Sequence, residues 1–113
     1  MLITILKSKI HMATITGTLL NYEGSIAVDP VLLKAAGLIP GEKVSVLNFN
    51  NSNRFETYLI KGMKGEISLR GPAARLGKKG DKVIILSYGM AEPREAAKIK
   101  PKIIHVDGGN RIK

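Results

Sequence analysis

Residues 21–46 read NYEGSIAVDPVLLKAAGLIPGEKVSV, and this stretch carries the clearest signal of the fold. The run SIAVD is short and apolar, which predicts a strand. Asp29 suits a helix N-cap, a proline follows at the first helical position, and Gly37 is placed to end the helix in a left-handed conformation. Pro40-Gly41 suits the centre of a type II turn. The stretch therefore predicts a strand, a short helix, a turn and a further strand.

Short β-type segments also dominate on both sides of this stretch. LITILKSKIHMATIT (2–16) is rich in β-branched residues and predicts one long strand or two consecutive strands. NNSN (50–53) predicts a hairpin loop, PAARLG a short helical turn, and DGGNRIK (107–113) a flexible tail. Further strands are expected at residues 42–49, 54–62, 66–70, 82–89 and 102–106. We expect one all-β domain over residues 1–113 with short helices, closed into a barrel because closure removes exposed sheet edges.

The composition excludes several classes of protein and site. A chain of 113 residues is long enough for one compact domain, and 44% hydrophobic residues without Trp predict an aliphatic core. The absence of Cys excludes a disulfide, a thiol nucleophile and a thiolate metal site, and it is compatible with a cytoplasmic location. No signal peptide and no membrane span are expected from the apolar runs. His11 and His105 are the only histidines, so no metal site is expected.

The net charge is strongly positive. Eighteen Lys and Arg against nine Asp and Glu give +9, which suits either nucleic acid or the attraction of small acidic substrates. The densest basic runs, RLGKKGDK (75–82) and REAAKIKPK (94–102), are not interleaved with the aromatic residues that stack on bases. We therefore interpret the charge as a solvated basic surface and expect no nucleic-acid partner.

A few polar residues are spaced so that they share a strand face. Lys9 and His11 lie two apart in a predicted strand, so their side chains are about 7 Å apart and suit an anion or a plain polar face. Arg54 and Tyr58 also share a face, but a regular strand separates them by about 13 Å, and Thr57 points the other way. Convergence of these residues on one site requires a distorted strand or an interface between chains.

The order of the motifs is more specific than any motif alone. In chain order they are Lys9-x-His11, YEGS (22–25), RFxTY (54–58) and GPAA (71–74). Together they resemble the pyruvoyl-dependent aspartate 1-decarboxylases over nearly the full chain. The resemblance implies a double-psi β-barrel and a homotetramer with active sites between subunits. It also implies conversion of L-aspartate to β-alanine and carbon dioxide for pantothenate synthesis in the cytoplasm.

Self-cleavage between Gly24 and Ser25 is a further implication of the resemblance. The Ser25 hydroxyl would attack the Gly24 carbonyl and form an ester, with Thr57 stabilising the oxyanion. Glycine leaves that carbonyl uncrowded. β-Elimination would release residues 1–24, the β chain. Hydrolysis with loss of ammonia would then leave residues 25–113, the α chain, with a covalent pyruvoyl group derived from Ser25 as the cofactor.

For turnover, the resemblance implies a Schiff base between the pyruvoyl carbonyl and the substrate amine, with the carbonyl as an electron sink. Arg54 corresponds to the carboxylate-binding arginine, and Lys9 and His11 to the residues beside it. Tyr58 corresponds to the proton donor. The remaining residues that correspond to the substrate site are Thr57, Gly71, Pro72 and Ala73.

Residues 70–73 depart from the family pattern, which usually reads Asn-Gly-Ala-Ala where this chain has RGPA. Arg70 either adds a cation near the substrate or points outward. Pro72 removes one backbone donor from the segment that lines the site. A preference for glutamate over aspartate, and the need for a processing factor, stay open at this point.

Two other functions are compatible with parts of the sequence. Residues 25–46 resemble the strand–helix–turn–strand unit of swapped-hairpin DNA-binding regulators, which are usually shorter than this chain and require neither YEGS nor RFxTY. A family member that has lost its activity and serves as a structural protein also retains these motifs. Self-cleavage would distinguish the enzyme from the regulator, because the chain of a regulator is not cleaved. We favour the decarboxylase on the specificity of the combined motifs.

Overall fold

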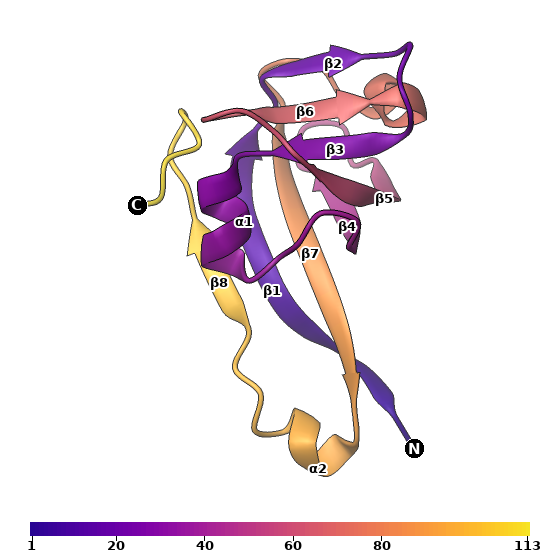
Figure 1. The fold of residues 1–113 in the computed structure, drawn as a ribbon, viewed down its shortest axis with the longest axis vertical. Helices are drawn as coiled ribbons and strands as arrows, with labels where there is room; N and C mark the ends of the chain where they lie inside the picture. Colours follow the sequence, from indigo (N-terminus) through magenta and orange to yellow (C-terminus); the bar gives the residue numbers. More distant parts are fainter.

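The computed structural model describes residues 1–113, with eight strands, two α-helices and one 3₁₀ helix. Two long strands, β1 and β7, run side by side along the molecule, and β2, β3 and β6 cross them at one end (Figure 1). No helix has the length and apolar character needed to cross a membrane. In chain order the elements are β1 (Ile3–Thr14), β2 (Gly17–Leu19), β3 (Ser25–Val28), α1 (Pro30–Ala36), β4 (Lys43–Asn48), β5 (Arg54–Lys61), β6 (Ile67–Arg70), the 3₁₀ helix η1 (Gly71–Leu76), β7 (Lys82–Ala91), α2 (Pro93–Ala96) and β8 (Lys102–His105).

The helix and turn signals in residues 29–41 are confirmed. Asp29 caps α1, since its Oδ1 accepts a hydrogen bond from the Val31 N–H at 2.8 Å, and Pro30 is the first helical residue. Gly37 ends the helix at φ 67° and ψ 35°, and Gly41 has the positive φ of 89° that a type II turn requires. These local signals fix the path of the chain from β3 to β4.

The eight strands form one mixed sheet in the order β2-β6-β3-β5-β4-β7-β1-β8. Parallel and antiparallel neighbours alternate around β3, which pairs in parallel with β5 and antiparallel with β6. Strands dominate the chain and its helices are short. The expected fold class, all-β with short helices, is therefore confirmed, and the mixed sheet is compatible with a double-psi β-barrel.

Aliphatic side chains fill the core, as the composition predicts. Eighteen buried residues form one cluster that contains only Ile, Leu, Val and Ala. Ile26 and Val28 of β3 pair in register with Leu69 and Ile67 of β6, and all four are fully buried. Side chains alternate along a strand, so Ser25 lies on the face of this strand pair that is turned away from the core.

Several elements differ from those expected. β2 and α2 were not expected; β2 pairs in parallel with β6, and α2 overlaps the start of the basic run 94–102. The segment 2–16 forms one long strand, but its pairing with β7 shifts register between Ile10 and Ala13, where Met12 adopts a φ of 63°. This bulge bends β1 just after His11.

Residues 107–113 are anchored to the rest of the fold, whereas their Gly-rich polar composition predicted a flexible tail. Asn110 is buried, and its side-chain oxygen accepts a hydrogen bond from the Thr14 N–H at 2.7 Å. The amide nitrogen of Asn110 donates to the carbonyl oxygens of Thr14 at 2.9 Å and Gly65 at 3.0 Å. Val106 and Ile112 also form a β-bridge. The partners of Asn110 are far away in sequence, so no local pattern predicts this anchor.

Candidate active site

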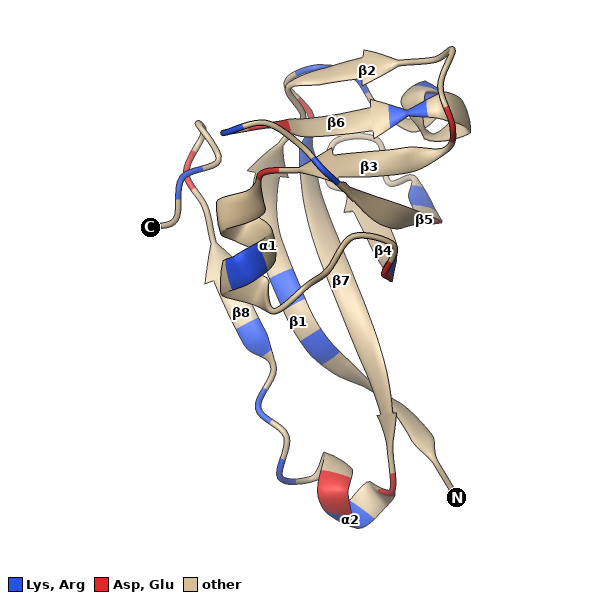
Figure 2. Cartoon of the chain, viewed as in Figure 1, with Lys and Arg blue, Asp and Glu red and all other residues tan.

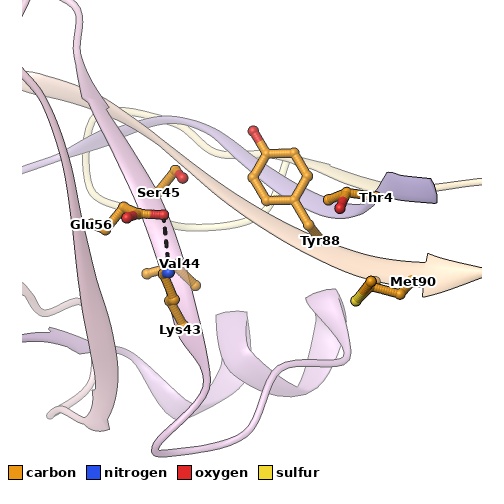
Figure 3. Close-up of a pocket in the computed structure, with 8 residues that line it drawn as sticks. Thr4, Lys43, Val44, Ser45, Glu56, Tyr88 and Met90 are labelled. Carbon is orange, nitrogen blue, oxygen red and sulfur yellow. Dashed lines mark ion pairs between the residues drawn. The ribbon is translucent and has the colours of Figure 1, made fainter. Parts of the chain in front are cut away.

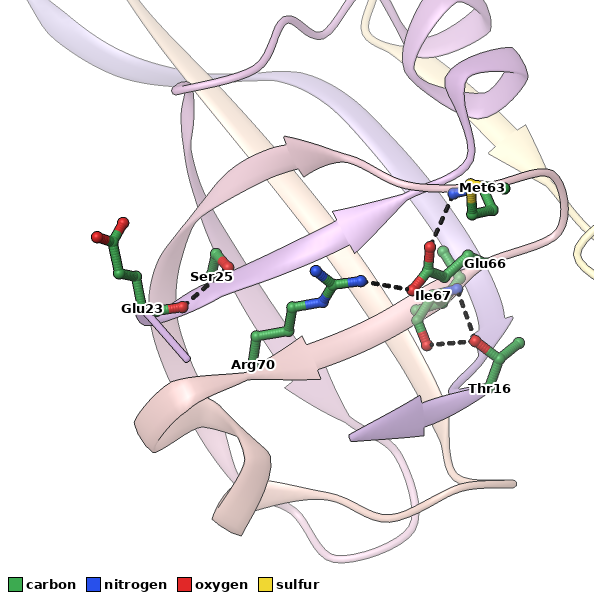
Figure 4. A network of polar contacts seen from close by, with 7 residues as sticks. All are labelled: Thr16, Glu23, Ser25, Met63, Glu66, Ile67 and Arg70. Carbon is green, nitrogen blue, oxygen red and sulfur yellow. Dashed lines mark hydrogen bonds and ion pairs between the residues drawn. The ribbon is translucent and has the colours of Figure 1, made fainter. Parts of the chain in front are cut away.

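The Gly24-Ser25 step lies where β3 begins, beside β6. Ser25 is fully buried, and its hydroxyl donates a hydrogen bond to the carbonyl oxygen of Glu23 at 3.1 Å (Figure 4). In the antiparallel pairing of β3 with β6, Ser25 is registered opposite Arg70. The Ser25 hydroxyl is therefore turned back toward the chain that precedes it, in a position fixed by the sheet.

Gly71 packs directly against this step. A Cβ built on Gly71 would lie 2.6 Å from the carbonyl oxygen of Tyr22 and 2.7 Å from both the nitrogen and the Cα of Gly24. Gly71 also has a φ of 67°, a left-handed conformation that favours glycine. A Cβ on Gly24 would in turn lie 3.3 Å from the Cδ of Pro72. The corner between β6 and η1 thus holds the backbone of residues 22–24 in close contact.

A pocket of about 320 Å³ opens beside Gly24. Because β3 and β5 pair in parallel from Ile26 and Leu59 onward, the Gly24-Ser25 step lies level with the middle of β5. Eight residues line this pocket, and five of them are residues that the sequence predicts for the site: Gly24, Thr57, Tyr58, Pro72 and Ala73. The other three are Phe55, Glu56 and Leu76. The fold therefore gathers the residues expected for cleavage and proton donation at one opening.

The cationic residues predicted for the site do not line this pocket. Arg54 is exposed at the start of β5 and lines a separate pocket of about 240 Å³. Lys9 and His11 lie on β1, and three strands separate β1 from β3 in the sheet order. Within one chain, the Gly24-Ser25 step and the expected carboxylate-binding groups are therefore apart.

A further pocket, also of about 320 Å³, lies between β4, β5 and β7 (Figure 3). Its charged groups, Lys43 and Glu56, form an ion pair at 3.3 Å, with side chains that are 71% and 62% exposed. Pairs this exposed contribute little to stability. The pocket contains none of the residues that the motifs single out, so we do not assign it to the active site.

Comparison with known proteins places the chain in a family. The family model described as aspartate decarboxylase matches residues 1–113. The chain belongs to the aspartate decarboxylase family. Among its relatives, the aspartate 1-decarboxylase of Pelotomaculum thermopropionicum is 53% identical over 114 aligned residues, which cover 99% of this chain and 86% of the relative. That of Carboxydothermus hydrogenoformans is 52% identical (99% and 90% covered), and that of Leptospira biflexa 53% identical (100% and 98% covered).

The family assignment gives no support to a DNA-binding regulator. The strand–helix–turn–strand unit that suggested it is present, but it forms one part of a full-length decarboxylase match. Lys and Arg are spread over most elements of the fold rather than gathered along one of them (Figure 2). The basic residues are thus not concentrated on one element of the fold.

In this member of the family, His11 lies beside a second histidine that the sequence did not single out. β1 and β8 pair in parallel at His11 and His105, and their rings meet edge-on with centroids 5.4 Å apart. Burial lowers the pKa of His11, and the positive charges of Lys9, His105 and Lys113 lower it further. The Nδ1 atom of His11 is buried without a hydrogen-bond partner. Only the strand pairing reveals this neighbour, because the two histidines are far apart in sequence.

Arg70, where this chain departs from the usual family pattern, does not point outward. One guanidinium nitrogen donates to Glu66 Oε2 at 2.9 Å, and the guanidinium carbon lies 4.8 Å from the centre of the Tyr22 ring. The Arg70 side chain is only 21% exposed. The outward alternative is therefore wrong, and Glu66 and Tyr22 are the side chains that Arg70 contacts. The four-residue spacing of Glu66 and Arg70, which puts both on one strand face, was the available signal.

Proposed function

We propose that this protein is an aspartate 1-decarboxylase that cleaves its own chain between Gly24 and Ser25 and then converts L-aspartate to β-alanine and carbon dioxide for pantothenate synthesis. Relatives that are 52–54% identical bear the name of this enzyme. One structural observation carries the proposal. The Gly24-Ser25 step, with its buried hydroxyl, lies beside a pocket lined by Thr57 and Tyr58. The proposal includes the cytoplasm as the compartment and a homotetramer as the assembly, both expected from the family resemblance.

Self-cleavage starts at the Ser25 hydroxyl. Its oxygen adds to the Gly24 carbonyl carbon, the peptide C–N bond breaks, and the Ser25 nitrogen takes the hydroxyl proton, which leaves an ester. The hydrogen bond to Glu23 holds the hydroxyl on the side of the chain that it attacks. Thr57, which lines the pocket beside Gly24, supplies a donor for the developing oxyanion.

A pyruvoyl group fits position 25. It has fewer atoms than the serine it replaces, so the buried position at the start of β3 accommodates it without new space. The adjacent pocket gives a small amino acid access to this end of β3. When present, the group supplies a carbonyl that acts as an electron sink for the loss of a carboxylate.

The other residues bind the substrate and deliver a proton. The planar guanidinium of Arg54 suits bidentate contact with a carboxylate, and Lys9 and His11 add hydrogen-bond donors for the second one. Tyr58 lines the pocket, and its hydroxyl supplies the proton to the substrate carbon after carbon dioxide leaves. The net charge of +9 attracts an amino acid that carries two carboxylates.

The separation of these groups within one chain supports a site shared between subunits. Lys9, His11 and Arg54 do not line the pocket beside Gly24, so we expect a neighbouring chain to supply them. Mixed assemblies test this expectation. Co-expression of Lys9→Ala and Ser25→Ala chains should recover up to about one quarter of wild-type activity, because random mixing pairs an intact Ser25 with an intact Lys9 at that frequency. No recovery in verified mixed tetramers would place both residues in the same chain's site.

Intact-mass measurement tests the cleavage. After prolonged incubation, we expect fragments 1–24 and 25–113, the second lighter by one ammonia than simple hydrolysis would give. Ser25→Ala should remain one chain and form no β-alanine, whereas Ser68→Ala, which removes another buried hydroxyl from the adjacent strand, should cleave normally. Cleavage of Ser25→Ala at the same bond would indicate a contaminating protease and refute the mechanism.

A further inference from the structure

The side chains of Arg70 and Ser25 lie on the same face of the β3–β6 pair. The two residues are registered directly opposite each other, and such cross-strand partners have Cβ atoms about 5 Å apart. The next pair on this face, Ala27 and Ser68, carries small side chains. The Arg70 side chain extends along this face from beside Ser25 toward Glu66 (Figure 4). The Arg70 side chain therefore begins next to the proposed cleavage step and runs over small, buried residues toward Glu66.

The hydrogen-bonding capacity of Arg70 is only partly used. One terminal nitrogen donates to Glu66, and the guanidinium lies over the ring of Tyr22. Its Nε atom is buried and has no hydrogen-bond partner. An unpaired buried donor is unfavourable and usually has a partner in some state of the protein. The guanidinium lies over Tyr22, two residues before Gly24, and the next residue, Gly71, is in backbone contact with Gly24, so Arg70 borders the segment that would end at Gly24.

Scission changes the charge at this position. The intact chain has a neutral peptide bond after Gly24, whereas the released 1–24 fragment ends there in a carboxylate. Ser25 is fully buried and Gly24 partly so, and a carboxylate removed from water without a partner is strongly disfavoured. Glu66 balances Arg70 before cleavage, but Glu66 already has a second hydrogen bond, to the Met63 N–H at 2.7 Å. Arg70 is therefore able to share its charge with a second anion.

We infer that Arg70 stabilises the carboxylate of Gly24 as it leaves during self-processing, and so acts on the elimination step rather than on the acyl shift. This inference rests on the proposed self-cleavage. In the ester, Gly24 is joined through its carbonyl carbon to the Ser25 oxygen. Solvent water takes the proton from the Ser25 Cα, those electrons form the Cα–Cβ double bond, and the Cβ–O bond breaks. The oxygen leaves with the electron pair as part of the Gly24 carboxylate, to which Arg70 donates.

Hydroxylamine trapping separates the two steps. Hydroxylamine cleaves an ester at residue 25 and leaves an intact Ser25 on the larger fragment. After completed elimination, by contrast, the larger fragment no longer has a serine at position 25. For Arg70→Met we expect the acyl shift to proceed and the elimination to slow by about tenfold to a hundredfold, the usual effect of losing a hydrogen bond to a charged group. The chain should then accumulate as a hydroxylamine-sensitive species with the mass of the unprocessed protein.

Three further variants make this result specific to the Arg70 charge. Arg70→Lys keeps the charge without the Nε donor and should lie between wild type and Arg70→Met. Arg75→Met removes an exposed arginine from the neighbouring helix η1 and should process like wild type. Glu66→Gln removes the competing anion and should not accumulate the ester. Far-ultraviolet circular dichroism and assembly size should match wild type in each variant.

The outcomes distinguish this inference from the proposed function. Elimination at the wild-type rate in Arg70→Met would overturn the role of Arg70 while leaving self-cleavage in place. A folded Arg70→Met chain that resists hydroxylamine would also overturn it, because the acyl shift itself would then be blocked. A wild-type chain that neither cleaves nor reacts with hydroxylamine would refute self-processing, and the Arg70 inference with it.

Discussion

Substitution of Gly71 by alanine should both destabilise the protein and slow self-cleavage. The added Cβ would lie 2.6 Å from the Tyr22 carbonyl oxygen and 2.7 Å from two backbone atoms of Gly24, all closer than real Cβ contacts. None of these atoms is the end of a flexible side chain, so either the β6–η1 corner or residues 22–24 must move. Gly71 is also in the left-handed region, at φ 67°.

The destabilisation has two separable parts. Holding alanine in the left-handed conformation costs about 1–2 kcal/mol, and forcing an extra carbon into a packed site about 1–3 kcal/mol. Together they predict a loss of about 2–5 kcal/mol in the free energy of unfolding. Gly80→Ala is the matched control, since Gly80 has a φ of 95° but no atom within 4 Å of its added Cβ. The control should therefore show the conformational part alone, about 1–2 kcal/mol.

Stability is best measured in a Ser25→Ala background, where neither variant is processed. Denaturant unfolding then gives the two free energies, and the difference between Gly71→Ala and Gly80→Ala isolates the steric part. With Ser25 restored, Gly71→Ala should process on the order of a hundredfold more slowly, because a displacement of about 1 Å has that effect on reacting atoms. Equal stability and equal processing in the two variants would refute the close contact between Gly71 and the cleavage step.

Three further predictions concern turnover and titration. Tyr58→Phe should leave fragment formation near the normal rate while kcat falls by about 10²–10⁴, as measured by β-alanine production on the same sample; equal loss of both would remove Tyr58 as the proton donor. Arg54→Lys should raise KM for aspartate by roughly tenfold to a hundredfold through loss of the bidentate fork, and an unchanged KM would move the carboxylate site elsewhere. His11 should titrate below 6.5 in an NMR pH series, and His105→Ala should bring its pKa back toward that value. Because the pKa of His11 is lower in the folded state, the unfolded chain takes up a proton on this residue more readily than the folded chain does. The free energy of unfolding should therefore decrease as pH falls below about 6.5. A His11 midpoint at or above 6.5 would contradict the desolvation of its ring.

Short-range signals predicted much of the fold. The cap at Asp29 and the helix end at Gly37 depend on residues next to each other in sequence, and both appear in the structure. One long strand or two consecutive strands were predicted over residues 2–16 for the same reason, since β-branched composition is local, and the structure has one strand, Ile3–Thr14. β2 has only three residues and is half exposed, so no periodic pattern marks it, and its pairing with β6 is the only reason it is a strand.

The residues of the candidate site also divide into those that local sequence motifs predict and those that only strand pairing brings together. The motif around Thr57 and Tyr58 was found from sequence, and both residues line the pocket beside Gly24. The ring contact between His11 and His105 and the position of Arg70 opposite Ser25 arise from strand register. Register depends on partners far along the chain, which a single sequence does not specify.

The proposed scission falls where breaking the chain leaves the sheet intact. Residues 1–24 include β1, which pairs with β7 at nine positions and with β8 at four, and which contributes Ile10 and Ala13 to the core. Residues 20–23, by contrast, are exposed and lie outside every strand. Ser25 pairs with Arg70 of β6, and the residues that follow it in β3 pair with both β5 and β6. Cleavage would therefore free only the short segment that leads to Gly24, so residue 25 would keep its position while the chain end in front of it moved aside to admit a substrate.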